Sequence, residues 1–160
     1  MSDLDDIQRD LAAVRAALFA SLEGVTPAEL EHRPPGPITD DEQRWPIVEV
    51  IWHVGLTEDR FRLTIDQVIT GRDVTPAAPR VRPAIMTTAT LLHEWLVQTR
   101  QPTEALLRRM QPADLDREYT RPNGTKRTPR QLLATIVQHD LDHAEQVRAL
   151  RALSTPPAEA

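Results

Sequence analysis

The sequence predicts an all-α protein, an up-down four-helix bundle with long connecting loops. Apolar residues recur every three or four positions over four long segments, which is the period of an amphipathic helix. Capping residues, prolines and glycines separate these segments. No segment shows the two-residue alternation of a convincing strand. Four such helices can bury their apolar faces against one another in a bundle.

The first long helix is predicted over residues 3–22, where leucine, isoleucine and valine lie at helical spacing. A short helix is predicted next, because Thr26-Pro27-Ala28-Glu29 combines a capping hydroxyl, a proline at the first helical position and an early acidic residue. It should end near His32, since the prolines that follow cannot continue it.

The second long helix is predicted from Trp45-Pro46 to about Thr70, where Gly71 supplies a stop. A proline-containing loop follows, and the third long helix should begin near residue 87 or 88. Pro102 falls inside its apolar pattern. A proline there predicts either a kink or a break, and the pattern does not choose between the two.

The turn sequence Pro122-Asn123-Gly124-Thr125 predicts a small hairpin around Tyr119. Thr128-Pro129 then begins the last helix, which should run to about Leu153. The chain of 160 residues fits one domain, placed at 1–153, and residues 154–160 are predicted to form a disordered tail.

Composition narrows the classes of function. The net charge of −5 argues against a nucleic-acid partner, because a phosphate backbone selects an excess of clustered lysine and arginine. Without cysteine, histidines and carboxylates are the strong transition-metal ligands available. The acidic N-terminus and the lack of a long apolar run predict neither a signal peptide nor a membrane segment, so a cytoplasmic location is expected.

Three histidines stand where helices normally place core leucines. His139 and His143 are four residues apart, so they lie one turn above each other on the apolar face of the last helix. His53 interrupts the apolar stripe of the second long helix in the same way. A divalent ion would satisfy all three imidazoles at once. The alternative is that each is a hydrogen-bonded core histidine.

Other polar residues are weaker candidates. Carboxylates are near the predicted ligands in sequence, and one of them could orient an imidazole, although most are interpreted as solvated surface charges. These carboxylates are Glu49, Glu58, Asp59, Asp140, Asp142 and Glu145. His32 and His93 are placed outside the site. Trp45, Trp52 and Trp95 are interpreted as core or loop anchors rather than as a substrate box.

Three motifs resemble those of the DinB-like metal-binding bundles, a family sometimes grouped with bacterial thiol-dependent S-transferases. They are the Trp45-x-Ile47-x-Glu49-Val50-x-x-His53 segment with the preceding Arg33-Pro34, the Thr128-Pro129 helix start, and the His139-x3-His143-x2-Gln146 core. The resemblance implies a four-helix bundle in which His53, His139 and His143 hold a divalent metal, nickel or zinc, with open positions for water or substrate. It also implies a homodimer.

The leading functional hypothesis is a metal-dependent thiol S-transferase, or a related enzyme, that acts on a small electrophile. A low-molecular-weight thiol would then be a second cofactor, supplied from outside because the chain has no cysteine. The alternatives are a non-catalytic metal-binding or stress-related ligand-binding bundle, and a purely structural bundle. For a dimer, the leucines at positions 11, 18, 92 and 96 are the predicted exposed apolar face.

Overall fold

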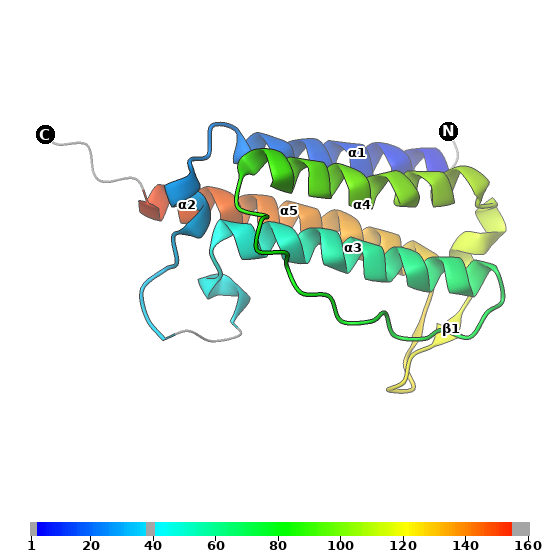
Figure 1. Cartoon of the computed structure of the whole chain (residues 1–160). Helices are drawn as coiled ribbons and strands as arrows, with labels where there is room; N and C mark the ends of the chain where they lie inside the picture. Colours follow the sequence, from blue (N-terminus) through cyan, green and yellow to red (C-terminus); the bar gives the residue numbers. More distant parts are fainter. Residues whose placement is uncertain (1–2, 38–40, 155–160) are drawn as a thin grey trace, which may run out of the picture.

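The computed structural model describes residues 3–37 and 41–154 and shows a bundle of four long helices (Figure 1). These helices are α1 (Asp3–Leu22), α3 (Ile47–Ile69), α4 (Ala89–Arg109) and α5 (Pro129–Ser154). The shorter elements are α2 (Pro27–Glu31), the 3-10 helices η1 (Glu42–Arg44) and η2 (Pro112–Asp116), and the strands β1 (Tyr119–Thr120) and β2 (Lys126–Arg127). The all-α class and the four-helix bundle are confirmed. Of the predicted tail, residues 155–160 lie outside the described residues.

The helix directions depart at one point from a simple alternation. The segment between α3 and α4 returns along the length of the bundle, so α3 and α4 run parallel (Figure 1). An ion pair between Arg109 and Asp66 joins their C-terminal ends. Arg130, at the start of α5, pairs with Asp3 at the start of α1, so these two helices are also parallel. A long crossover makes this arrangement sterically accessible, as in other bundles.

Local sequence signals explain the helix ends. Thr26 and Glu29 form the predicted capping box at α2. The side chain of Thr88 accepts a hydrogen bond from the Leu91 amide and so caps α4. The α4 helix continues through Pro102 without a break. Pro102 is exposed, as is Gln98 one turn earlier, so water can solvate the carbonyl that the proline leaves without a helical donor.

The predicted hairpin is confirmed. Tyr119 pairs with Arg127 and Thr120 with Lys126 in an antiparallel register. Gly124 adopts a left-handed φ of 82° at the turn, a conformation that favours glycine. Among the described residues, no helix has the length and the apolar character that a membrane span requires.

The apolar core is divided into two clusters by a layer of charged side chains. Each of the four long helices supplies one charge: Arg15 from α1, Glu58 from α3, Arg100 from α4 and Asp140 from α5. In every helix this residue falls between positions that belong to the two clusters. On α1, for example, Leu11 and Leu18 lie on either side of Arg15 and pack into different clusters.

The four charges satisfy one another. Arg15 Nε donates to Asp140 Oδ2 at 2.8 Å, and Arg100 Nε donates to Glu58 Oε1 at 2.8 Å. Arg15 also donates to Glu58, and Arg100 Nη2 donates to Asp140 Oδ2 at 2.9 Å. The remaining guanidinium donors reach two backbone carbonyls on neighbouring helices. The layer therefore contains two positive and two negative charges. These four residues are only 1 to 6% exposed, and charges buried this deeply need partners of opposite sign.

The predicted exposed apolar face for a dimer is wrong. Leu11 is 2% exposed, and Leu18, Leu92 and Leu96 are 0% exposed, because all four pack into the core of their own chain. A core stripe and a dimer stripe have the same three-to-four spacing, so the spacing alone does not separate them.

Candidate metal centre

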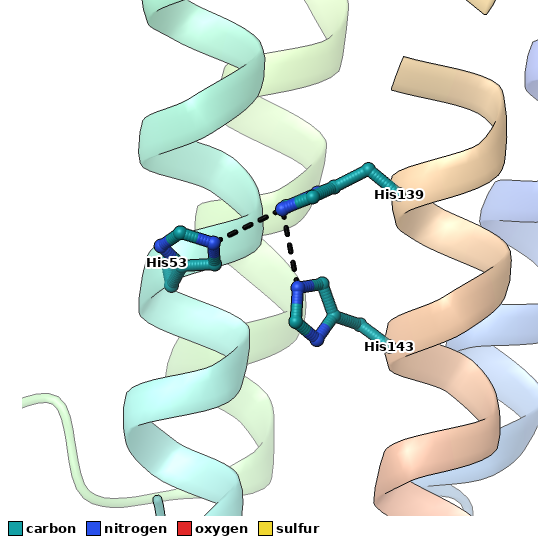
Figure 2. Close-up of side chains that lie close together, drawn as sticks. All are labelled: His53, His139 and His143. Carbon is teal, nitrogen blue, oxygen red and sulfur yellow. Dashed lines mark hydrogen bonds between the residues drawn. The ribbon is translucent and has the colours of Figure 1, made fainter. Parts of the chain in front are cut away.

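The three histidines predicted from the sequence come together between two facing helices (Figure 2). His53 extends from α3, and His139 and His143 extend from consecutive turns of α5. His139 Nε2 lies 3.0 Å from His53 Nε2 and 3.1 Å from His143 Nε2. Three ring nitrogens of the same type therefore point at one small volume.

Gln146 fixes which nitrogen of His143 faces that volume. Its side-chain oxygen lies 2.7 Å from His143 Nδ1, so that nitrogen carries the proton and donates it. Nε2 is then left with its lone pair directed toward the other two rings. Gln146 is held in turn, because its Nε2 donates to the backbone carbonyl of Glu42 at 2.5 Å.

The surroundings keep two of the imidazoles neutral near neutral pH. Burial lowers the pKa of His53, a shift that the nearby Glu42 carboxylate opposes. Burial, followed by the charges of His143, His53 and Arg15, lowers the pKa of His139 to about 3. A neutral imidazole has a free lone pair, which is the form that binds a metal ion.

The donor set fits a divalent transition metal. Two ligands bound at about 2.0–2.1 Å and separated by about 90–110° lie roughly 3 Å apart. The two Nε2–Nε2 distances of 3.0 and 3.1 Å match this spacing. The ligand atoms of all three side chains lie within 4.8 Å of one another. The hydrogen bond from His143 Nδ1 to Gln146 is of the kind that orients metal-binding histidines elsewhere.

The cluster opens toward solvent on one side. A cleft of about 430 Å³ is lined by His139 and His143, by Glu42 and Gln43 from η1, and by Gln146 with other residues of α5. Glu42 Oε1 lies 3.6 Å from His53 Nε2. Trp45 stands edge-on to the His53 ring, with ring centroids 5.1 Å apart.

Most of the carboxylates considered from the sequence have other partners. Glu49 pairs with Arg82, Asp59 with Arg62, and Asp142 accepts a hydrogen bond from Gln138. Glu58 and Asp140 belong to the charged layer. Glu145 lines the cleft, but no contact with an imidazole joins it to the site.

The remaining histidines and tryptophans follow the prediction in part. His93 is exposed and stacks on Phe19, and His32 is the C-cap residue of α2. Trp52 and Trp95 stack in the core with centroids 4.4 Å apart. Trp45, interpreted as an anchor, also contacts His53.

Sequence reasoning missed Glu42. It lies in a loop without apolar period, and its approach to His53 depends on how η1 folds back. One local signal was present, because the Asp41 side chain caps η1 by accepting from the Gln43 amide. That signal predicts a turn, and it does not predict what the turn approaches.

These features define a class of protein, a four-helix bundle with a three-histidine candidate metal centre between two of its helices. The chain belongs to the DinB superfamily, because the model of that family matches residues 10–147. No functionally curated protein matches the chain.

Solved structures share the fold. TT2238, described as a four-helix bundle protein, is 19% identical with a TM-score of 0.63 and covers 91% of this chain and 98% of its own. A conserved protein of Enterococcus faecalis is 14% identical with a TM-score of 0.69, covering 96% and 97%. The colibactin self-resistance protein ClbS, solved in complex with double-stranded DNA, is 13% identical with a TM-score of 0.71, covering 95% and 97%. At these identities the likeness concerns the fold alone.

Proposed function

We propose that the chain binds one divalent metal ion through His53, His139 and His143 and uses it to activate a small nucleophile. The observation that carries this proposal is the convergence of three Nε2 atoms at a spacing that suits metal coordination, beside an open cleft. A closed structural site would enclose a fourth protein ligand instead.

The residues around the centre have distinct roles in this proposal. The three imidazoles hold the ion, and Gln146 holds His143 in the required tautomer. When bound, a divalent ion there supplies Lewis acidity that favours the deprotonated form of a ligand such as water or a thiol. Glu42 is the carboxylate placed to take up that proton, because its Oε1 lies near the converging nitrogens and borders the cleft.

A small thiol is the proposed nucleophile, and a small electrophile is the proposed substrate. The chain has no cysteine of its own, so a thiol has to enter through the cleft. Nickel and zinc are the proposed ions, because three imidazoles suit both.

A homodimer is also proposed, and light scattering tests it. DNA binding is not proposed, since the net charge of −5 opposes contact with a phosphate backbone.

The activity test uses monochlorobimane, a fluorogenic electrophile, with glutathione, bacillithiol or mycothiol as the thiol. Protein loaded with nickel or zinc should accelerate conjugation with at least one of the thiols, and the chelated protein should not. His53→Ala should lose the acceleration, whereas His93→Ala, a matched change at an exposed histidine, should keep it.

The alternative is a metal-binding bundle without catalysis. Bound metal in the wild type together with no acceleration for any thiol would favour this alternative over the thiol transferase. Acceleration that persists in His53→Ala would contradict a role for the centre.

A further inference from the structure

A second cleft lies two helical turns from the histidines, in the groove between α3 and α5. Its volume is about 380 Å³. Arg60 on its α3 wall is seven residues after His53, and Leu132 on its α5 wall is seven residues before His139. Seven residues correspond to about 10 Å along a helix and return to the same face. Because α3 and α5 are antiparallel, Arg60 and Leu132 are both displaced from the histidines toward the hairpin end of the bundle (Figure 1).

Three arginines line this cleft without a balancing acid. Arg60 comes from α3, and Arg121 and Arg127 come from the hairpin. None of the described residues that line the cleft is acidic. Nor does any of the three arginines form an ion pair within the part of the chain that the structure describes. The cleft is therefore locally cationic in a chain of net charge −5.

The acidic residues next to the cleft form ion pairs with other cationic side chains. Asp59, next to Arg60, pairs with Arg62 at 2.7 Å and with Arg80 at 3.4 Å. On the hairpin, Glu118 pairs with Lys126 at 2.8 Å. Like charges gathered in one cleft repel one another and concentrate a positive potential there. An anionic ligand would remove that repulsion.

Most of the other residues that line the cleft are apolar, and one rim is held in place by hydrogen bonds. Phe61, Tyr119 and Leu132 supply aromatic and aliphatic surface. The loop that forms one rim is tied to α3 by two hydrogen bonds between Gln67 and Thr75, of 3.0 and 3.2 Å. An apolar cleft of this size with a few convergent polar groups is typical of a small-molecule site.

We propose that this cleft binds a small organic anion with a carboxylate or phosphate group and an apolar body. Arginine suits either group, because its planar guanidinium can form two parallel hydrogen bonds to oxygen atoms. The apolar body would lie against Phe61 and Leu132, and the Tyr119 hydroxyl would be a further donor. The site is separate from the metal centre and goes beyond the function proposed for it.

The test is a titration of the whole chain in the presence of a chelator, which makes the result independent of the metal centre. Phenyl phosphate, benzoate and inorganic phosphate are the probes, and benzyl alcohol is the uncharged control, with binding followed by NMR chemical shifts. Phenyl phosphate or benzoate should saturate and shift resonances of the cleft residues, and benzyl alcohol should bind at least about tenfold more weakly. Comparing the two anions separates a phosphate from a carboxylate preference.

Single variants locate the site. Arg121→Gln and Arg127→Gln should each weaken binding of the preferred anion by about tenfold, the loss expected for one charge-assisted hydrogen bond. Arg148→Gln, at an exposed arginine on α5 outside the cleft, is the matched control and should leave binding unchanged. Equal binding of benzyl alcohol, no difference between the cleft variants and the control, or no saturable binding below about 10 mM would each overturn the proposal.

Discussion

At the scale of single residues, the Nε2 atoms of three histidines converge on one small volume, and Gln146 and Glu42 lie beside them. The i, i+4 spacing of His139 and His143 on an apolar stripe predicts that both rings point at one place. His53 is predicted from its own stripe, and the family motif connects it to the pair. The approach of Glu42 depends on a loop from a distant part of the chain, which local periodicity cannot report.

Gln146 provides a test of how the centre is oriented. Gln146→Ala removes the acceptor of His143 Nδ1–H, so the ring loses its fixed tautomer. We expect metal affinity to fall about 10- to 100-fold with little change in stability. Competition with a chromophoric chelator measures this change. Gln138→Ala, at an exposed glutamine of the same helix, is the control. Equal affinities for the two variants would show that Gln146 does not orient the ligand.

The lowered pKa of His139 predicts a pH dependence of stability for the metal-free protein. Between pH 6.5 and about 3, the unfolded chain binds a proton at this histidine that the folded chain does not. The free energy of unfolding should therefore fall as the pH decreases through this range. Denaturant titrations at about pH 7.5 and about pH 5 measure the fall. His139→Gln should show a smaller fall, and an identical pH profile would contradict the assignment.

At the scale of elements, helix starts and stops follow from caps and turn residues, but the charged layer was not predicted. Its signal was present, because Arg15 occupies a stripe position between Leu11 and Leu18, and Arg100 follows Leu96 at the same spacing. A lone charge on a stripe is usually interpreted as the edge of the apolar face. Only the arrangement of all four helices shows that the charges compensate one another.

Removing one charge from this layer should lower the free energy of unfolding. Glu58→Gln leaves Arg15 and Arg100 with a single carboxylate between them, in a buried setting. We expect a loss of about 3–5 kcal/mol in the free energy of unfolding, because an uncompensated buried charge remains. Glu104→Gln, at an exposed position of α4, should change it by less than about 0.5 kcal/mol. Chemical denaturation compares them, and a similar small effect for both would show that the layer does not depend on charge balance.

The packing of α3 against α4 requires a glycine. A Cβ at Gly55 would lie 2.3 Å from Trp95 Nε1, on a ring that is stacked against Trp52 and donates to the Trp52 carbonyl. Gly55→Ala should therefore destabilise the protein by about 1–3 kcal/mol, whereas the same change in an unconstrained helix stabilises by about 1 kcal/mol. A thermal melt gives the sign directly, and a more stable variant would contradict the packing described here.

At the scale of the whole molecule, the sequence predicts how many long helices there are and about where each begins and ends. It does not predict the direction of every helix in the bundle. The parallel run of α3 and α4 depends on the path of the connection between them, and a loop sequence without regular period does not specify that path. The same arrangement makes α3 antiparallel to α5 and brings the first third of α3, which carries His53, beside the histidine pair. The candidate centre is thus a product of topology as well as of motif.

The central claim is that His53, His139 and His143 form one metal centre, and elemental analysis tests it most directly. Protein purified without an affinity tag and reconstituted with nickel or zinc should contain about one ion per chain. His53→Ala should lose that ion, and His93→Ala should retain it, because His93 stacks on Phe19 away from the cluster. No bound metal in the wild type, or equal metal content in the wild type and His53→Ala, would contradict the account.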